Sequence, residues 1–381
     1  MTSSRNAKLC FVVSSPLTAR AFLSGHIAAL SERYVIDLAA DVDDQTELGD
    51  IRARARTIVP VRIRRQIALV ADLAALVKLF VLFRRERYAA VTSVTPKAGM
   101  LALLAATMAG APVRIHIFTG QVWATRRGWQ RKLLKAADRL MALLATHVLT
   151  DSVSQRDFMV AEGITVAEKI QVLGDGSICG VDGSRFRPDA DRRAKNRRAQ
   201  DIPEEAVVFL FLGRLNRDKG VLDLADAFAA LGNPATWLLV VGPDEGGLRG
   251  EMEFRLGAAM ARTRFVVYTD RPEDFMVAAD VLCLPSYREG FGMVIVEAAA
   301  AGIPAIASRI YGVTDAVEEG VTGLLHRPAD SAQLAREMAA LADDPARRTG
   351  MGGAARKRAL HRFSRQAVTA AWMRFYGQLL G

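Results

Sequence analysis

The segment with the clearest structural meaning is Pro285-Ser-Tyr-Arg-Glu-Gly-Phe-Gly-Met-Val-Ile-Val-Glu-Ala298. An apolar strand ends at Pro285, a loop carries Glu289, Gly290 and Gly292, and a helix begins near Met293. Glycine lets the backbone pass close to a ligand, and a helix N-terminus offers unpaired N–H groups and partial positive charge to an anion. The segment therefore predicts a ligand-binding strand-to-helix loop of a parallel sheet. The alternative is a tight turn without a ligand.

Short apolar runs alternate with helical patterns on both sides of this segment. Strands alternating with helices indicate βαβ units and a parallel sheet. We expect strands at 9–14, 34–39, 90–94, 113–118, 147–151, 207–212, 236–241, 264–268, 281–285 and 304–308. We expect helices at 19–30, 67–83, 98–109, 129–145, 219–231, 292–301, 330–341, 345–363 and 365–380.

The chain is long enough for two domains, because a single core rarely grows past about 250–300 residues. We predict an α/β fold with two Rossmann-like, doubly wound parallel sheets that face each other across a cleft. The expected division is an N-terminal domain at 1–190, a charged linker at 191–205 and a C-terminal domain at 206–362. The last helix, 363–381, is expected to cross back to the N-terminal domain.

A second strand end carries Leu212-Gly-Arg-Leu-Asn-Arg-Asp-Lys-Gly220. Arg214 and Lys219 can both reach an anion there, Arg as a two-pronged donor and Lys as a point charge. The alternative interpretation is a basic loop in which Asp218 caps the following helix. The motif therefore predicts an anion-binding loop at this strand end.

Together, these motifs resemble the C-terminal half of family 4 of the retaining glycosyltransferases, which have the GT-B fold. The motifs that carry the resemblance are Gly213-Arg214, Lys219-Gly220, Glu289-Gly-Phe-Gly292, Glu297-Ala298, Ala301-Gly-Ile-Pro304 and Gly320-Val-Thr-Gly-Leu324. Their order and spacing cover residues 209–325. The resemblance implies transfer of a hexose or N-acetylhexosamine from a nucleotide diphosphate sugar, with a UDP-sugar expected, and net retention of the anomeric configuration.

The resemblance also implies roles for individual residues. Arg214 and Lys219 hold the donor diphosphate and stabilise the leaving group, Glu289 contacts hydroxyls of the donor sugar, and Glu297 accepts hydrogen bonds from the ribose. The remaining donor-binding residues are Gly213, Gly290, Phe291, Gly292 and Met293. Cations and a helix terminus stabilise the departing charge without a metal, so we expect neither metal nor cofactor.

The N-terminal half is similar to bacterial enzymes that build O-antigen, capsule or glycoprotein glycan on undecaprenyl diphosphate. The motifs are Thr95-Pro-Lys-Ala-Gly99, Ile117-Phe-Thr-Gly-Gln-Val-Trp123, Asp151-Ser152, Ser154-Gln155, Gly180-Val-Asp182 and Phe186. The resemblance implies a saccharide linked to undecaprenyl diphosphate as the acceptor. Relatives carry Gly-Gly where this chain has Ser14-Ser15, and His-Gly where it has Thr119-Gly120. The candidates for the acceptor or lipid side are Lys97, His116, Thr119, Trp123, Arg126 and Arg127.

Positive charge is concentrated in one region of the chain. The net charge is +10, and residues 52–139 contain 18 Lys or Arg against three acids. The predicted helix at 67–83 places Leu69, Leu73, Leu76, Phe80 and Phe83 on one face, with arginines on either side of it. Trp123 and Trp129, with basic residues around them, extend the pattern. This pattern predicts peripheral binding to an anionic membrane, on its cytoplasmic inner face. The alternative is a core helix with solvated arginines.

Composition restricts the remaining function classes. Three scattered cysteines and no secretory leader favour a reduced cytoplasm. A nucleic-acid-binding protein, suggested by the basic pI, is disfavoured because aromatic residues are only 7% of the chain. A GT-B sugar-nucleotide epimerase remains the alternative enzyme. The donor sugar, the linkage and the oligomeric state stay open.

Overall fold

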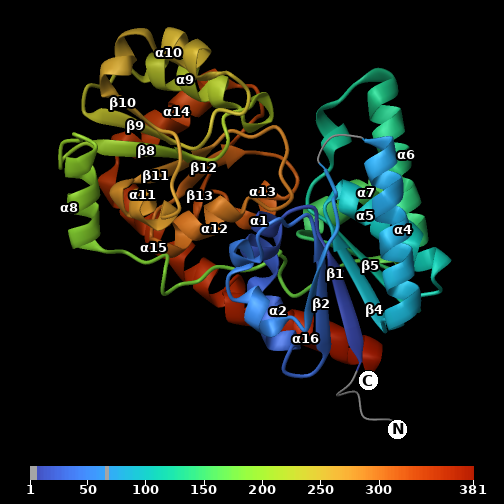
Figure 1. Ribbon diagram of the computed structural model, residues 1–381. Helices are drawn as coiled ribbons and strands as arrows, with labels where there is room; N and C mark the ends of the chain where they lie inside the picture. Colours follow the sequence, from blue (N-terminus) through green and yellow to red (C-terminus); the bar gives the residue numbers. More distant parts are fainter. Residues whose placement is uncertain (1–6, 65–67) are drawn as a thin grey trace. The chain divides into compact units, whose positions relative to one another are not determined.

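The computed structural model describes residues 7–64 and 68–381, which divide into two compact units. The first unit holds the chain up to Cys179 together with Arg365–Gly381, and the second holds Gly180–Ser364. Each unit contains one parallel sheet covered by helices (Figure 1). The predicted fold class, α/β with two Rossmann-like sheets, is confirmed.

The sheet of the first unit has the strand order β3-β2-β1-β4-β5-β6-β7, and every neighbouring pair is parallel. Its strands are β1 (Lys8–Val12), β2 (Val35–Ala40), β3 (Thr57–Pro60), β4 (Ala90–Val94), β5 (Val113–Phe118), β6 (His147–Thr150) and β7 (Ile170–Val172). The central strand β1 pairs Leu9 with Ile36 on one side and with Ala90 on the other. The edge strands β3 and β7 were not anticipated from the sequence.

The helices of this unit follow the strands in alternation. They are α1 (Pro16–Thr18), α2 (Ser24–Leu30), α3 (Ile51–Arg54), α4 (Leu69–Glu86), α5 (Pro96–Met108), α6 (Gly128–Leu144), α7 (Val153–Ala161) and α16 (Arg365–Leu380). The shorter turns are η2 (Ala19–Leu23), η3 (Gln45–Leu48) and η4 (Val122–Thr125). Because parallel crossovers are right-handed and α5 packs against both α4 and α6, these three helices cover the same face of the sheet.

Helix α16 joins the first unit from the far end of the chain. Its aromatic face is buried: Trp372 stacks on the His26 ring at 4.1 Å, and the Tyr376 hydroxyl lies 2.5 Å from the Thr92 hydroxyl. His26 also bonds through Nε2 to the Ile178 carbonyl at 2.8 Å, and burial lowers the pKa of its imidazole to about 4. The last helix is therefore part of the core of the first unit.

The sheet of the second unit has the order β10-β9-β8-β11-β12-β13, again with parallel neighbours. Its strands are β8 (Val207–Leu212), β9 (Thr236–Val241), β10 (Thr263–Val266), β11 (Val281–Leu284), β12 (Ala305–Ser308) and β13 (Gly323–His326). Its helices are α8 (Ala190–Ala199), α9 (Val221–Leu231), α10 (Arg249–Leu256), α11 (Pro272–Ala278), α12 (Met293–Ala300), α13 (Val313–Ala316), α14 (Ser331–Ala342) and α15 (Pro345–Arg362). The shorter turns are η5 (Arg217–Lys219) and η6 (Gly257–Arg262).

The charged segment 191–205, expected to be a linker, instead belongs to the second unit and begins with helix α8. Arg197 is almost fully buried, donates to the Ala278 carbonyl at 2.9 Å and forms a 2.7 Å ion pair with Asp280. Arg193 pairs with the same carboxylate group at 2.6 Å. Dense charge indicated solvent exposure, whereas these arginines fix α8 to the domain. The units divide after Cys179, not near 190.

Candidate functional site

The sequence-predicted donor residues gather at the carboxyl edge of the second sheet. Strands β8 and β11 are hydrogen-bonded neighbours, with Phe209 opposite Val281. The loop that follows β8 runs through 213–220, and the loop that follows β11 runs through 285–292. Both loops therefore leave the sheet at the same edge, where doubly wound sheets bind ligands.

Gly220 brings the two loops into direct contact. Its φ is +65°, and a Cβ added there would lie 2.0 Å from the Pro285 carbonyl oxygen. Any other residue would be strained by the left-handed backbone and would collide with the facing loop. The glycine is therefore required both for the turn and for the approach of the two loops.

Lys219 and Glu289, which are 70 residues apart, meet across this contact. The Lys219 ammonium donates to Glu289 Oε1 at 2.5 Å, and the buried Ser286 hydroxyl donates to the same oxygen at 2.7 Å. Both charged side chains are largely shielded from water. A hydrogen-bonded ion pair in such surroundings holds each group in a defined position. Ser286 was not singled out from the sequence.

The loops are joined by a second set of polar contacts. Asp218 accepts from the Arg288 guanidinium at 2.9 Å through its carboxylate and from the Tyr287 backbone N–H at 2.8 Å through its carbonyl. The Tyr287 hydroxyl donates to Asp223 on α9 at 2.6 Å. The alternative in which Asp218 caps a helix is wrong, because the Asn216 side chain accepts the Lys219 N–H and caps η5.

Arg214 lies on the outer side of the β8 loop and is half exposed. Its guanidinium donates to Glu245 at 3.0 Å, in the loop that follows β9. The two loops pack closely, since a Cβ on Gly242 would lie 2.0 Å from the Gly213 carbonyl oxygen. Glu245 was missed from the sequence, although the run Gly242-Pro-Asp-Glu-Gly-Gly247 after an apolar strand was an available signal.

The loop that precedes α12 has the geometry expected of a glycine-rich turn. Gly292 has φ +75° at the N-cap, and a Cβ on Gly312 would lie 2.4 Å from the Gly290 carbonyl oxygen. The Phe291 side chain points into the core and packs against Phe363 at 5.1 Å between ring centroids. Phe291 can therefore meet a ligand only through its backbone, whereas Met293 begins α12 with a half-buried side chain.

Glu297 lies in the second turn of α12. Burial raises the pKa of its carboxyl to about 7, nearby Glu273 adds to the rise, and Arg185 opposes it. Arg185 donates to Glu273 at 2.9 Å and to the Asp270 carbonyl at 3.0 Å. Glu297 is therefore an acceptor whose charge changes near neutral pH. Neither Arg185 nor Glu273 was singled out from the sequence.

The arrangement combines two cations with carboxylate partners at one sheet edge. Arg214 is held by Glu245 and Lys219 by Glu289, so each cation is positioned without being locked into a core. An incoming dianionic or trianionic group can take over these donors, because charged hydrogen bonds to phosphate oxygens have the same geometry. The site is suited to binding a diphosphate and to stabilising charge that develops on it.

In the first unit, two predicted acceptor-side residues are buried, which corrects the prediction that they face a ligand or lipid. His116 bonds through Nδ1 to the Ser93 hydroxyl at 2.9 Å and packs under Gly99, and burial lowers the pKa of its imidazole to about 3. Trp123 donates to Asp138 at 2.7 Å from a buried position, and burial raises the pKa of that carboxyl to about 6.

The other predicted acceptor-side residues remain closer to the surface. Lys97 forms a 2.7 Å ion pair with Asp72, which joins α5 to α4. Thr119 is half-buried after β5, and Arg126 and Arg127 are exposed before α6.

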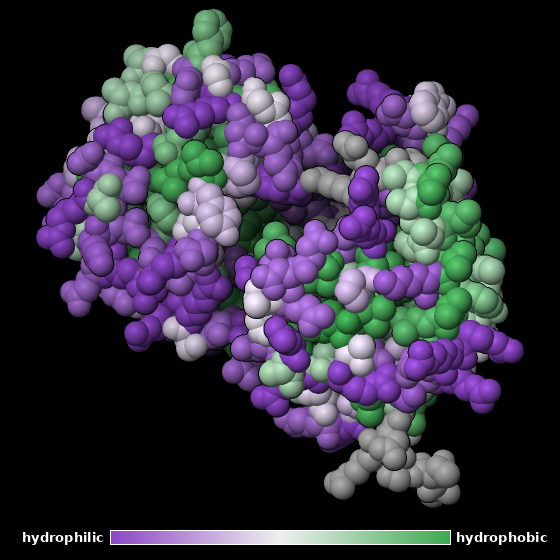
Figure 2. All heavy atoms as spheres, in the orientation of Figure 1, coloured by the Kyte–Doolittle hydropathy of each residue, from purple (hydrophilic) through white to green (hydrophobic). Residues whose placement is uncertain are grey.

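Helices α4 and α6 each expose an apolar stripe on the side away from the sheet. We call these stripes the outer face; its residues are Leu69, Val70, Leu73, Val77 and Val81 of α4, and Trp129, Leu133, Leu140 and Leu143 of α6. Figure 2 shows hydrophobic surface where Figure 1 draws these helices.

The apolar face predicted for helix 67–83 is not uniformly exposed: Leu69 and Leu73 are exposed, whereas Phe83 is buried and Leu76 and Phe80 are half-buried against the core. Of the residues around it, Arg65 and Ile67 lie outside the described part of the chain. Within residues 7–64 and 68–381, no helix has both the length and the apolar character needed to span a bilayer.

Family models match both units of the chain. The model described as "Glycosyl transferases group 1" matches residues 192–358, and "Glycosyl transferase 4-like domain" matches residues 19–176. The chain belongs to the family 4-like glycosyltransferases. The matched regions contain the donor-side loops in the second unit and the α4–α6 layer in the first.

Curated relatives are glycosyltransferases as well. The capsular polysaccharide biosynthesis glycosyltransferase CapM of Staphylococcus aureus is 28% identical over 349 residues, which are 91% of this chain and 90% of CapM. D-inositol 3-phosphate glycosyltransferase of Streptomyces avermitilis is 35% identical over 243 residues, which are 60% of this chain and 50% of that enzyme. This glycosyltransferase thus matches about half the length of the second relative.

A solved structure confirms the GT-B architecture of the units. The Anabaena protein HepE, crystallised with UDP and glucose, superposes with a TM-score of 0.82 at 20% identity, covering 98% of this chain and all of HepE. At this identity the likeness concerns the fold. The glycosyltransferase family and the fold class predicted from the sequence are both confirmed.

Proposed function

We propose that this glycosyltransferase moves a hexose or N-acetylhexosamine from a UDP-sugar to a saccharide linked to undecaprenyl diphosphate. The observation that carries the proposal is the meeting of Lys219 and Glu289, beside Arg214, at the carboxyl edge of the second sheet. The product belongs to O-antigen, capsule or glycoprotein glycan assembly. The likeness to CapM, a capsular polysaccharide biosynthesis glycosyltransferase, supports transfer into polysaccharide, and HepE was crystallised with UDP.

Glycosyl transfer from a nucleotide sugar needs few groups beyond Arg214, Lys219 and Glu289. Glycosyl transfer expels a nucleoside diphosphate, so negative charge grows on the oxygen that leaves the sugar. Arg214 and Lys219 stabilise that charge, and Glu289 orients the sugar through its hydroxyls once the diphosphate has taken over the Lys219 ammonium. Glu297 accepts from the ribose hydroxyls. The proposal includes metal-independent transfer with retention of the anomeric configuration.

The acceptor side of the proposal rests on the outer face of α4 and α6. A helix that is apolar on both sides is normally covered by another surface, and exposed arginines lie beside these stripes. A bilayer with anionic lipids supplies both an apolar layer and negative charge, each basic residue contributing about 1 kcal/mol near the surface. The proposed location is the inner face of the bacterial cytoplasmic membrane.

The test is label transfer from radioactive UDP-sugars to undecaprenyl-diphosphate-linked saccharide, followed by butanol extraction of the lipid. Wild type should place label in the lipid phase in the presence of EDTA. Arg214→Ala and Lys219→Ala should each lower the rate by several orders of magnitude, because one lost charge-assisted contact in a transition state costs about 3–4 kcal/mol. Lys357→Ala, an exposed position on α15, is the control and should behave as wild type.

Three results would contradict the proposal. Near-normal turnover of both the Arg214 and Lys219 variants would remove their assigned roles. Conversion of a UDP-sugar to its epimer without an acceptor would identify an epimerase instead. Label that remains in the aqueous phase with every lipid-linked acceptor tried would exclude this acceptor class.

A further inference from the structure

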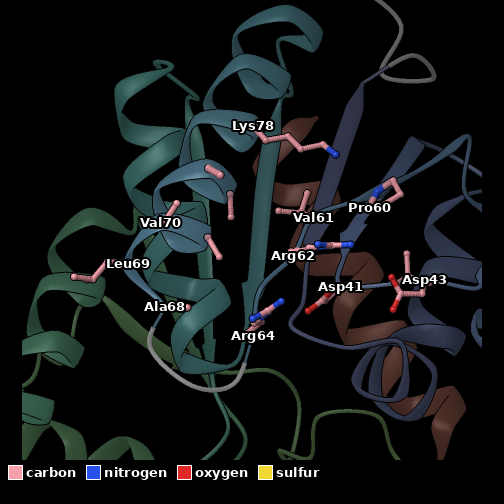
Figure 3. A pocket seen from close by; sticks show the side chains of 14 residues that line it. Asp41, Asp43, Pro60, Val61, Arg62, Arg64, Ala68, Leu69, Val70 and Lys78 are labelled. Carbon is pink, nitrogen blue, oxygen red and sulfur yellow. The ribbon is translucent and has the colours of Figure 1, made fainter.

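The first unit contains a cavity of about 780 Å3 that the donor site does not explain. It lies beyond the carboxyl ends of β2 and β3 and beside the first turns of α4 (Figure 3). Asp41 and Asp43 contribute from the loop after β2, Arg62 and Arg64 from the segment after β3, and Lys78 from α4. The volume is within the range of about 300–1,000 Å3 that is typical of small-ligand sites.

Most of the cavity surface is apolar. Val42 and Val61 form a buried floor, while Leu69, Val70 and Ala74 of α4 form a wall. Leu69 and Val70 are 80% and 85% exposed and also belong to the outer face. The cavity is therefore continuous with the apolar stripe of α4, so a hydrocarbon chain can extend from one to the other without crossing a polar surface.

The three cations at the cavity have no carboxylate partner among the described residues. Some basic side chains of this unit are paired, as Arg56 is with Asp37 and Glu86 and Lys97 is with Asp72. Arg62, Arg64 and Lys78 form no such pair in the described chain. Unpaired cations beside an apolar surface are complementary to a molecule with an anionic head and a hydrocarbon tail.

We propose that this cavity binds the diphosphate and the adjoining isoprenyl units of the lipid-linked acceptor. The proposal rests on the proposed function, which supplies an acceptor of this class. Arg62, Arg64 and Lys78 outnumber Asp41 and Asp43 in the lining and can donate charged hydrogen bonds to a diphosphate, whereas the apolar floor and wall match the first isoprenyl units. The rest of the chain follows the outer face of α4 toward the bilayer.

Binding is measured by calorimetric titration of the full-length protein with farnesyl diphosphate, a soluble isoprenyl diphosphate. Saturating UDP is present throughout, so that the diphosphate site of the second unit is occupied. Inorganic pyrophosphate carries the head alone and farnesol the chain alone, and each should bind at least about tenfold more weakly than farnesyl diphosphate. Dihexanoylphosphatidylglycerol represents a membrane phospholipid and should also bind at least tenfold more weakly.

Two variants perturb the cavity by independent means. Arg62→Ala/Arg64→Ala removes charge, and the matched control is Arg52→Ala/Arg54→Ala, an exposed pair of the same spacing on α3 at the opposite end of β3. Ala74→Trp fills the cavity without changing charge, and its control is the exposed Ala53→Trp. Each cavity variant should weaken farnesyl diphosphate binding by about tenfold or more, whereas both controls should bind like wild type.

The same four variants are assayed for sugar transfer to the lipid-linked acceptor. The cavity variants should raise the acceptor KM while UDP affinity stays unchanged. Wild-type binding and KM in both cavity variants would overturn this inference and leave the proposed function intact. Equal or tighter binding of dihexanoylphosphatidylglycerol would also overturn it, in favour of a phospholipid. Absence of transfer by the wild type, with an intact farnesyl diphosphate response, would instead contradict the proposed function.

Discussion

Glu297 should make donor binding depend on pH near neutrality. Its carboxyl has a pKa of about 7, and the ionised form is the stronger acceptor for the two ribose hydroxyls, because both of its oxygens accept and it carries a charge. If only that form binds, the apparent Kd for UDP rises by the factor 1 + 10^(7 − pH), because the competent fraction falls. The factor is roughly 11 at pH 6 and about 1.1 at pH 8, so UDP should bind about tenfold more weakly at pH 6.

The same shift has a consequence for stability. The ordinary pKa of the carboxyl is 4.5 and its folded value is about 7, so the folded state binds more protons between these values. Stability linked to Glu297 is therefore complete below pH 4.5 and is lost as the pH rises through about 7. At pH 8 the loss is at most about 3 kcal/mol. Glu297→Gln should raise the free energy of unfolding at pH 8 while weakening UDP binding there.

The assay is calorimetric titration with UDP from pH 6 to 8.5, together with urea unfolding at pH 8. Because a phosphate of UDP itself titrates near pH 6, Glu297→Gln and a 2′,3′-dideoxy analogue of UDP are the controls for the ligand's own pH dependence. The extra tenfold change should vanish in both controls. A wild-type pH profile identical to that of Glu297→Gln, or a variant less stable than wild type at pH 8, would refute the reasoning.

Three further changes have directions fixed by local geometry. Gly220→Ala introduces a Cβ 2.0 Å from a backbone oxygen at φ +65°, so thermal unfolding should show that the free energy of unfolding falls by more than about 1–3 kcal/mol. In the control Gly350→Ala, in open space on α15, the free energy of unfolding should instead rise by about 0.5–1 kcal/mol. Ser286→Ala removes a hydrogen bond to the Glu289 carboxylate and should lower kcat about five- to tenfold, for a bond of about 1 kcal/mol, with UDP affinity nearly unchanged; an unchanged kcat contradicts it. Leu73→Glu combined with Val77→Glu on the outer face should abolish flotation with anionic liposomes, and wild-type flotation of that variant would exclude α4 as a membrane contact.

The central part of the fold could be predicted because its strands are rich in β-branched and aliphatic residues. Strands β4, β5, β8 and β9 begin and end where the sequence analysis placed them. The edge strands β3, β7 and β13 were missed. They are short, with three or four residues each, and β3 ends at Pro60 between arginine-rich segments. Their pairing depends on neighbouring strands.

The loops of the candidate site could be predicted from the sequence, whereas the tertiary contacts of individual side chains could not. The loops that carry Lys219 and Glu289 follow from strand-end motifs, and the family resemblance connected them. Trp123 was interpreted as a surface aromatic because basic residues surround it in the sequence. Its indole instead donates a hydrogen bond to Asp138 on the following helix, α6, and the Arg131 guanidinium lies over the ring. Such tertiary partners leave no mark in local composition.

Helix α16 has a consequence for how the protein is made. The first unit is built mainly from the chain up to Cys179, yet its core lacks Trp372 and Tyr376 until the ribosome has translated α16. The second unit is continuous in sequence and can fold during synthesis, whereas the first unit still lacks the helix that covers part of its sheet. Newly synthesised chains therefore pass through a period of aggregation risk that ends only once α16 has been made and has packed onto the first unit. A deletion that removes the last turns would make that vulnerable state permanent.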